Sequence, residues 1–82
     1  MLKLLYFAWV REAIGRDGET IDPGAAATVD DLLDALAEQP PYSEAFADRA
    51  KLRCAVDQKF VPLDAPIGGA RELAIFPPVT GG

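Results

Sequence analysis

The sequence predicts an α+β domain in which one long helix packs across a mixed β-sheet. Residues 2–10 and residues 72–76, near the two ends of the chain, are almost continuously apolar, which is typical of strands covered on both faces. Between them, residues 29–37 carry apolar side chains at the spacing of one helix face. Because fully covered strands occupy the centre of a sheet, we expect the first and last strands to lie side by side.

Length and composition indicate one compact domain. The chain has 82 residues, of which 50% are hydrophobic, well above the level typical of disordered chains. Its single cysteine, Cys54, excludes an internal disulfide and fits a reducing compartment, and we expect it to be a small buried residue on a strand. No apolar run approaches the ~20 residues that span a membrane, and residues 1–3 show no signal-peptide pattern, so we expect a cytoplasmic protein.

The charge is acidic and uneven. A formal net charge of −5 disfavours nucleic acid and anionic membranes as partners. Residues 17–48 contain nine acidic residues and no lysine or arginine, whereas residues 49–82 contain five basic and three acidic residues. Two interpretations remain open: a solvated acidic face, or a surface that steers the protein toward a basic partner.

The first half of the chain predicts a second strand and the main helix. Residues 11–15 indicate one helical turn that a glycine ends, and residues 19–22 a short strand that Pro23-Gly24 ends. Thr28 is a good N-cap for the main helix, and Asp31 stands where it can complete a capping box. The apolar stripe of this helix comprises Val29, Leu32, Leu33, Leu36 and Ala37.

The second half predicts three further strands. Pro40-Pro41 ends the main helix, and we expect residues 43–48 to add a short second helix. Residues 52–56 indicate a strand, followed by a tight turn at Asp57-Gln58 and a return strand over residues 59–61. The order β-β-α-β-β-β, with the first and last strands paired, is the β-grasp arrangement of ubiquitin. A ferredoxin-like sandwich is the alternative, but it needs a second full-length helix.

The side chains alone supply no catalytic or metal site. The chain has no histidine, which excludes imidazole catalysis and most zinc sites, and one cysteine without histidine is not a protease arrangement. Asp30, Asp31 and Asp34 are better explained as helix capping and solvated surface than as metal ligands. We therefore expect no bound metal or cofactor, and no enzyme activity of the isolated chain.

The last segment of the chain, Phe-Pro-Pro-Val-Thr-Gly-Gly, carries the group on which we base the function. Proline donates no backbone hydrogen bond, so Pro77 and Pro78 end the last strand. We expect a folded domain over residues 1–78 and a free tail over residues 79–82, because nothing in the tail can anchor it to the core. The two final glycines, which lack Cβ atoms, make the end of this tail thin enough for a narrow channel.

Three segments carry a resemblance to a known family. With ELAIFPPVTGG at its end, YFAWVREAIG near its start and AVDQKFVPLDAPI in its second half, the chain resembles the small subunits of molybdopterin synthase. These proteins are ubiquitin-like sulfur carriers. The resemblance covers nearly the whole chain, although residues 16–50 carry no recognisable motif. It implies the β-grasp fold independently of the strand order.

The resemblance implies a cycle of chemistry at the α-carboxylate of Gly82. A carboxylate is a poor electrophile, so an adenylyltransferase would use ATP to convert Gly82 to an acyl-adenylate, and sulfide delivered as a persulfide would then give a thiocarboxylate. The large synthase subunit, which supplies the catalytic lysines, would accept the tail. The sulfur would enter cyclic pyranopterin monophosphate, and two transfers would complete the dithiolene of molybdopterin. The chain would thus be carrier and co-substrate in a complex that we expect to be a heterotetramer.

The resemblance also assigns residues. Gly81 and Gly82 match the reactive end, and the part of the tail that enters the large subunit comprises Val79, Thr80 and Gly81. Partner contacts fall on an apolar patch and its surroundings, comprising Phe7, Arg11, Phe60, Phe76, Pro77 and Pro78. Phe60 stands where another large aliphatic residue is usual. Asp57 replaces an asparagine expected in the hairpin turn, and Arg71 stands where an acidic residue is common.

Other interpretations remain open from the sequence. The three phenylalanines, which we expect to form an exposed patch beside the exit of the tail, could instead lie in the core. The chain could carry sulfur for another pathway, such as tRNA thiolation or thiamine synthesis, although its ending and its length argue against thiamine. It could be a ubiquitin-like modifier that forms isopeptides on protein lysines, since modifiers and sulfur carriers both use an adenylated Gly-Gly end. A non-covalent interaction domain would not need a free C-terminus.

Overall fold

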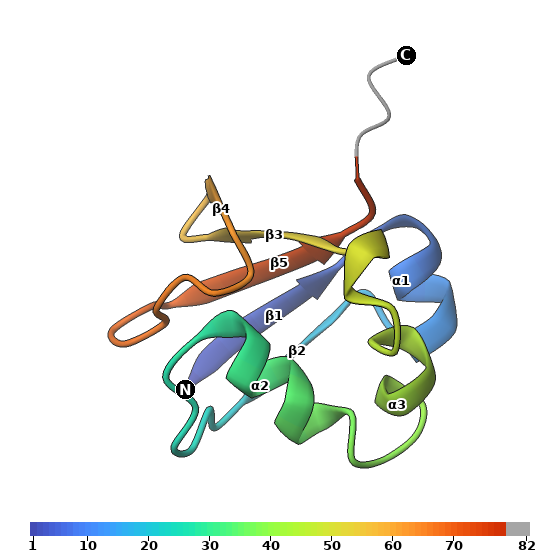
Figure 1. Cartoon of the computed structure of the whole chain (residues 1–82), viewed down its shortest axis with the longest axis horizontal. Coiled ribbons are helices and arrows are strands. Elements are labelled where there is room, and N and C mark those ends of the chain that lie inside the picture. Colours follow the sequence, from blue (N-terminus) through green and yellow to red (C-terminus); the bar gives the residue numbers. More distant parts are fainter. Residues whose placement is uncertain (79–82) are drawn as a thin grey trace.

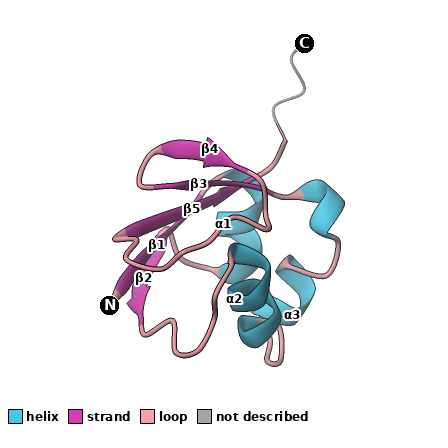
Figure 2. Ribbon diagram, turned by 60° about the vertical axis from the view of Figure 1, so that its left-hand side comes forward, coloured by secondary structure: helices cyan, strands magenta, loops and turns pink. Residues whose placement is uncertain are grey.

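The computed structural model describes residues 1–78, which form a five-stranded mixed sheet with helices on one of its faces (Figure 1, Figure 2). The strand order across the sheet is β2-β1-β5-β3-β4. In chain order the strands are β1 (Leu2–Tyr6), β2 (Gly18–Ile21), β3 (Arg53–Val56), β4 (Lys59–Val61) and β5 (Glu72–Phe76). The helices are α1 (Ala8–Ile14), α2 (Val29–Leu36) and α3 (Tyr42–Ala45), followed by a 3₁₀ turn over Arg49–Lys51.

The two most apolar strands pair at the centre of the sheet, as predicted. Strands β1 and β5 run parallel, with Leu4 opposite Leu73 and Tyr6 opposite Ile75, and all four side chains are buried. Strand β2 pairs antiparallel with β1, and β3 pairs antiparallel with β5, so each central strand has a neighbour on both sides. The predicted β-grasp fold is confirmed. Because β1 and β5 are parallel, the C-terminal ends of both strands lie at the same end of the sheet.

Helix α2 begins where its capping residues predict. Thr28 Oγ1 accepts a hydrogen bond from Asp31 N (3.1 Å), and Asp31 Oδ2 accepts one from Thr28 N (3.3 Å), which confirms the capping box. Most of the apolar stripe is buried against the sheet: Val29, Leu32 and Leu33 completely, Leu36 and Ala37 partly. The helix ends at Leu36, before the first of the two prolines. The predicted long helix therefore has 8 residues, one more than α1.

The first strand is shorter than predicted. It ends at Tyr6, and residues 8–10 belong to α1. A continuous apolar run does not by itself separate a strand from a buried helix. Here Val10 and Ile14, one helical turn apart, both face the core, so tertiary packing decides the conformation. Gly15 ends α1 in the left-handed region, at φ 90°, as the predicted stop requires.

Other boundaries also differ from the prediction by a few residues. Strand β2 covers Gly18–Ile21 rather than residues 19–22, and the second helix covers Tyr42–Ala45 rather than residues 43–48. A contact distant in sequence holds that helix, because Tyr42 OH donates a hydrogen bond to Glu19 Oε2 (2.6 Å) on β2. The local sequence pattern around residues 42–48 does not reveal a contact with a residue on β2, so it could not predict the bounds of this helix.

Cys54 is a buried residue of β3, as predicted. Its thiol donates a hydrogen bond to the carbonyl of Val61 (3.4 Å). Burial, with a smaller effect of the negative charge of Asp30, raises the pKa of the Cys54 thiol to about 11. The side chain is therefore a protonated thiol at neutral pH, and it behaves as a packing residue rather than as a nucleophile.

Glu19 joins three elements on the helix side of the sheet. Its Oε2 accepts hydrogen bonds from Tyr6 OH and Tyr42 OH, both at 2.6 Å, and its Oε1 accepts one from Arg16 (3.1 Å). Partial burial raises the pKa of Glu19, but the hydrogen bonds from Tyr42 and Tyr6 and the charge of Arg16 outweigh it, so the pKa is lowered. Burial, followed by the contact with Glu19, raises the pKa of both tyrosines. The ionised carboxylate thus ties together β1, β2 and α3.

Part of the acidic surface is used within the fold. Arg49 donates hydrogen bonds to Asp30 (2.9 Å) and Asp34 (2.7 Å) on α2, and a third to the carbonyl of Phe46 (2.9 Å). These contacts fasten the segment before β3 to the main helix. Asp30 and Asp34 thus take part in contacts within the fold, whereas the choice between a solvated acidic face and a steering surface stays a prediction.

Candidate functional site

The sheet face opposite the helices is apolar and open. Along β1 the side chains alternate, so Leu4 and Tyr6 face the helices while Leu5 and Phe7 face the other way. On that reverse face, one row of paired residues crosses four strands: Leu5, Ala74, Ala55 and Phe60. Within residues 1–78, no helix covers this face (Figure 2). The expectation that the first strand is covered on both faces is thus wrong for the part of the chain that the structure describes.

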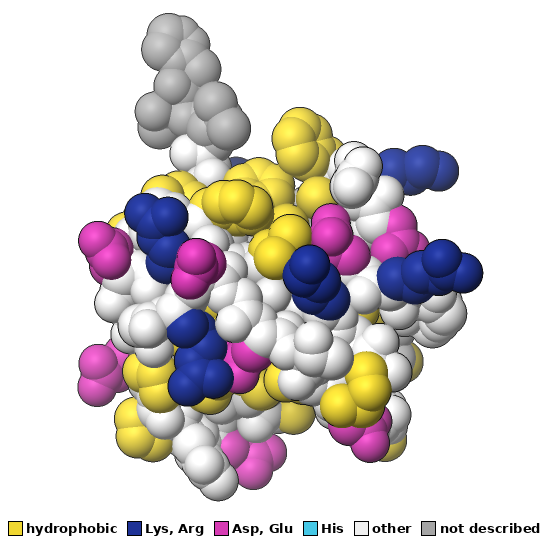
Figure 3. Space-filling model, turned by 180° about the vertical axis from the view of Figure 1, so that it is seen from behind, with side chains coloured by type: hydrophobic (Ala, Val, Ile, Leu, Met, Phe, Trp, Pro, Cys, Tyr) yellow, Lys and Arg dark blue, Asp and Glu magenta, His cyan; other side chains and the backbone are white. Residues whose placement is uncertain are grey.

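Three phenylalanines surround a shallow hollow on this reverse face. Its volume is about 380 Å³, and its lining comprises Leu5, Phe7, Ala55, Gln58, Phe60, Glu72, Ala74 and Phe76. The two alanines form a low floor, and Phe7, Phe60 and Phe76, which we call the aromatic patch, form the walls. The side chain of Phe60 is 83% exposed and that of Phe7 is 47% exposed. Figure 3 shows hydrophobic side chains gathered on this face.

The aromatic patch combines Phe7, which directly follows β1, with Phe76 of β5 and Phe60 of the β3–β4 hairpin. The rings of Phe60 and Phe76 lie 5.6 Å apart between centroids, tilted by 52°, which is an attractive arrangement of aromatic rings. Strand β4, which carries Phe60, pairs with β3, and β3 pairs with β5, which carries Phe76. Three segments far apart in the sequence therefore build one apolar surface. A surface of this kind on a small protein usually marks an interaction site.

The chain leaves the sheet beside this patch. Because β1 and β5 are parallel, Phe7 and Phe76 lie at the same end of the sheet, where Phe7 N donates a hydrogen bond to the carbonyl of Ile75 (3.2 Å). Pro77 and Pro78 follow directly and are half-buried. Arg11 is exposed on α1, which also starts at this end of the sheet. The strand pairing and the start of α1 thus bring the patch, the two prolines and an arginine to one end of the molecule.

The predicted site residues fall into two groups. The structure brings together Phe7, Phe60 and Phe76, and it places Arg11, Pro77 and Pro78 at the same end of the sheet. The role of these residues in binding a partner stays a prediction. The tail residues Val79, Thr80, Gly81 and Gly82 lie outside the described residues.

Sequence reasoning missed the floor of the hollow. Besides the two alanines of the floor, the hollow is lined by Leu5, Gln58 and Glu72, which sequence reasoning did not single out as site residues. The signal that could have found it is the alternation of side chains along each strand, combined with the pairing of β1 with β5.

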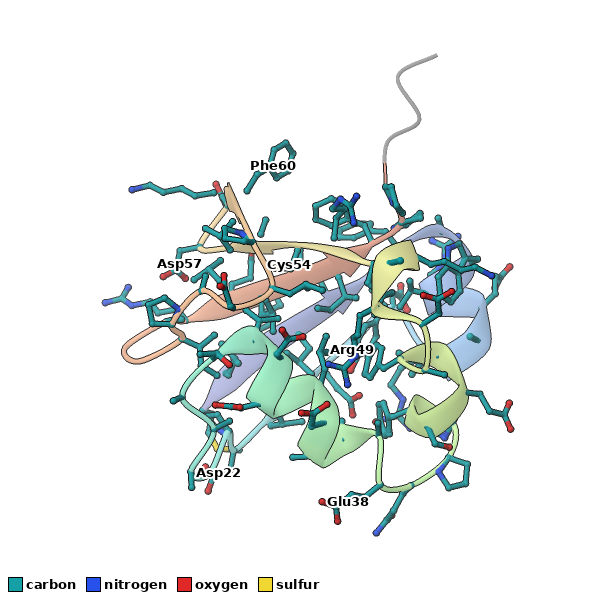
Figure 4. All side chains as sticks on the ribbon, in the orientation of Figure 1. Asp22, Glu38, Arg49, Cys54, Asp57 and Phe60 are labelled. Atoms are coloured by element: carbon teal, nitrogen blue, oxygen red, sulfur yellow. The ribbon has the colours of Figure 1, made fainter. Side chains whose placement is uncertain are left out.

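The hairpin that carries Phe60 is bound to the start of β5. Its turn residues, Asp57 and Gln58, have φ of 49° and 71°, as a tight two-residue hairpin turn requires. Asp57 Oδ1 accepts hydrogen bonds from both Arg71 N and Glu72 N, each at 3.0 Å, and Asp57 N donates one to the carbonyl of Glu72 (3.0 Å). The carboxylate therefore fastens the turn to the sheet. Figure 4 shows Asp57 at this turn and Phe60 projecting from the hairpin away from the helices.

The ionisable groups with shifted pKa values lie outside the aromatic patch. Tyr6, Glu19 and Tyr42 form the hydrogen-bonded network on the helix side of the sheet, and Cys54 is buried on β3 next to a second hollow that Phe60 and Phe76 line. Among residues 1–78 there is no group of three or more side chains arranged to hold a metal ion. In the same part of the chain, no helix is both long enough and apolar enough to cross a membrane. The reverse face thus offers an apolar contact surface bordered by the exit of the chain.

Comparison with known proteins gives concordant matches in sequence and in structure. The model of the ThiS family matches residues 4–82. The chain is 39% identical to the molybdopterin synthase sulfur carrier subunit of Escherichia coli (strain K12), over the full length of both chains.

Two solved structures are similar over nearly the whole chain. A putative molybdopterin converting factor, subunit 1, from Pyrococcus furiosus has a TM-score of 0.71 at 27% identity, over 95% of this chain and 97% of that one. The small archaeal modifier protein 1 of Haloferax volcanii has a TM-score of 0.69 at 30% identity, also over 95% of this chain and 97% of that one.

Proposed function

Since this chain belongs to the ThiS family, we propose that it is a sulfur carrier and serves as the small subunit of molybdopterin synthase. The observation that carries the proposal is the 39% identity, over the full length of both chains, to a protein named molybdopterin synthase sulfur carrier subunit. The aromatic patch beside the end of β5 supports the proposal, because partner proteins must bind the folded part of a carrier while its C-terminus reaches their reactive centre. The protein would not be an enzyme on its own.

The reactive group in this proposal is the α-carboxylate of Gly82. ATP would activate it as an acyl-adenylate on a partner adenylyltransferase, because AMP is a far better leaving group than oxide. Attack by a persulfide sulfur would release AMP, and reduction of the resulting acyl disulfide by a second thiol would leave a thiocarboxylate. A thioacid is more acidic than a carboxylic acid, so the group is ionised at neutral pH and nucleophilic through sulfur. It would then attack cyclic pyranopterin monophosphate to build the dithiolene of molybdopterin.

The other residues would position this group. We assign residues 1–78 to a folded β-grasp domain and residues 79–82 to a tail, of which Val79, Thr80 and Gly81 would enter the active site of the large subunit. The globular contact would be made by Phe7, Arg11, Phe60, Phe76, Pro77 and Pro78. The patch lies at the end of the sheet where β5 terminates, so a partner that binds the patch would also fix the point from which the tail starts. The large subunit and the adenylyltransferase would use this same surface in turn, and the synthase would be a heterotetramer.

The energetics of the patch suit reversible binding. Phe60 buries little of its ring in the isolated chain, so a partner can remove most of that apolar surface from water. Burial of one phenylalanine side chain contributes about 1.5–3 kcal/mol, and aromatic residues at the centre of an interface often dominate its binding energy. A hollow with walls of Phe7, Phe60 and Phe76 can also receive an apolar side chain of the partner.

Intact mass spectrometry of the protein purified from its own host tests this function. Replacement of one oxygen by sulfur at Gly82 is the expected result. A reconstituted reaction with the large subunit and cyclic pyranopterin monophosphate should then consume the thiocarboxylate and return the carboxylate. Protein from an actively synthesising host that never carries sulfur at Gly82, and that does not support molybdopterin formation after chemical thiocarboxylation, would contradict the proposal.

A ubiquitin-like modifier is the second candidate, favoured by the structural similarity to the small archaeal modifier protein 1 of Haloferax volcanii. Both functions use an adenylated glycine, but a modifier passes its acyl group to the amino group of a protein lysine. The same mass measurement separates them, because a modifier gives branched lysine conjugates of other proteins. A carrier for tRNA thiolation or thiamine synthesis would also carry sulfur at Gly82, and only the acceptor in the reconstituted reaction distinguishes it.

A further inference from the structure

Phe60 is the most exposed ring of the aromatic patch, and the structure does little to fix it through burial. Its strand, β4, is three residues long and lies at the edge of the sheet. With 83% of its surface exposed, Phe60 is held by the hairpin backbone and by its contact with the ring of Phe76. The geometry of the patch therefore depends on what holds the hairpin.

Asp57 supplies an attachment outside the ladder between β3 and β4. One carboxylate oxygen, Oδ1, accepts hydrogen bonds from the backbone of both Arg71 and Glu72, and Asp57 N donates to the carbonyl of Glu72; all three distances are 3.0 Å. These partners lie at the start of β5, the strand that ends with Phe76. The hairpin that carries one ring of the patch is thus fastened to the strand that carries the next.

We propose that Asp57 is a positioning residue for the partner surface: by fastening the hairpin turn to β5, it holds Phe60 in place beside Phe76. This inference rests on the proposed function, since it concerns the surface through which the carrier binds the large synthase subunit. Without the carboxylate, the backbone N–H groups of Arg71 and Glu72 lose their partner in the protein, and the turn keeps only its backbone hydrogen bond to the carbonyl of Glu72 and the ladder to β3. Phe60 then has to be ordered during binding, at a cost in affinity.

Three substitutions separate the role of the carboxylate from that of the turn. Asp57→Asn retains an oxygen at the position of Oδ1 and tolerates positive φ, so it should bind the large subunit within about twofold of the original chain. Asp57→Gly also tolerates positive φ but has no acceptor, so it should bind about fivefold more weakly, in line with roughly 1 kcal/mol for the lost hydrogen bonds. Asp57→Ala, which combines the loss with strain at φ 49°, should bind no more tightly than the glycine variant.

A double-mutant cycle tests whether the effect acts through Phe60. Affinity for the large subunit is measured by titration calorimetry for Asp57→Gly, Phe60→Ala and the double variant, with Phe7→Ala in place of Phe60→Ala as the matched control. In the Phe60→Ala background the glycine substitution should change affinity by less than about twofold, because the ring that it positions is gone. In the Phe7→Ala background the loss of about fivefold should persist.

The outcomes are distinct. A fivefold loss that persists in the Phe60→Ala background would overturn the positioning role, and so would an Asp57→Gly chain that binds like the original or that does not fold. A Phe60→Ala chain with full affinity would count against the proposed docking surface itself, whatever Asp57 does. Weak binding by Asp57→Asn together with normal binding by Asp57→Gly would also overturn the inference, because it reverses the expected order.

Discussion

Two phenylalanines of this chain should respond to truncation in opposite ways. Phe46 is 1% exposed in the core, whereas Phe60 is 83% exposed on the aromatic patch. Only about a sixth of the surface of Phe60 is removed from water, so its burial contributes about 0.3–0.5 kcal/mol to folding if full burial contributes 1.5–3 kcal/mol. The ring contact with Phe76 adds about 0.5–1.5 kcal/mol. Phe60→Ala should therefore lower the free energy of unfolding by less than about 2 kcal/mol, and Phe46→Ala by about 3–5 kcal/mol.

Binding should show the reverse order. Phe60→Ala should weaken binding to the large synthase subunit at least about tenfold, the equivalent of 1.4 kcal/mol. Phe46→Ala, measured on its folded fraction, should leave that affinity unchanged, since Phe46 lies on the helix side of the sheet. Urea denaturation and titration calorimetry on the same preparations provide both quantities. A large loss of stability for Phe60→Ala with unchanged affinity would refute the reasoning, because it would place the ring in the core rather than at the interface.

Three further predictions concern the tail, the helix and the carboxylate network. Deletion of Gly82 should abolish sulfur transfer in a reconstituted assay and leave the circular dichroism spectrum unchanged; a deleted chain with full activity would contradict the carrier function. Leu33→Ala should cost about 2–5 kcal/mol in the free energy of unfolding and Thr28→Ala only about 1 kcal/mol, and chemical denaturation giving the opposite order would refute the assignment of core and cap. Because the pKa of Glu19 is lowered from its ordinary value of 4.5, its contribution to stability is present above that pH and is lost as pH falls through the lowered pKa. The stability difference between the original chain and Glu19→Gln should therefore shrink on acidification, and a difference independent of pH would show that the ionised carboxylate is not what stabilises the fold.

The elements that could be predicted from the sequence are those whose cause is local. The capping box of Thr28 and Asp31 and the turn at Asp57-Gln58 depend on side chains a few residues apart, and both form as predicted. The pairing of β1 with β5 is not local, yet the two nearly continuous apolar runs predict it, because such strands occupy the centre of a sheet. The premise that both faces of these strands are covered is nevertheless wrong within residues 1–78 (Figure 2). Composition and short-range chemistry thus predict the strand order at the centre of the sheet, the cap and the turn.

Boundaries and contacts that depend on tertiary structure could not be predicted. The apolar run over residues 2–10 has two explanations locally, and packing of Val10 against the core selects the helix. The hydrogen bonds of Tyr6 and Tyr42 to Glu19 join residues from three separate elements, so no pattern in any one of them reveals the network. The same holds for the role of Asp57, whose turn is visible in the sequence but whose partners on β5 are not.

The parallel pairing of the two central strands explains why the aromatic patch and the exit of the chain from the sheet coincide. An antiparallel pair would place Phe7 and Phe76 at opposite ends of the strands, because one strand would end where the other begins. The parallel pair brings both strand ends together, and the alternation of side chains then directs both rings to the reverse face at that end, with Phe7 exposed and Phe76 half-buried. A partner that binds the aromatic patch necessarily binds beside Pro77. Under the proposed function, the strand topology, rather than any single residue, would couple recognition of the globular domain to delivery of the tail.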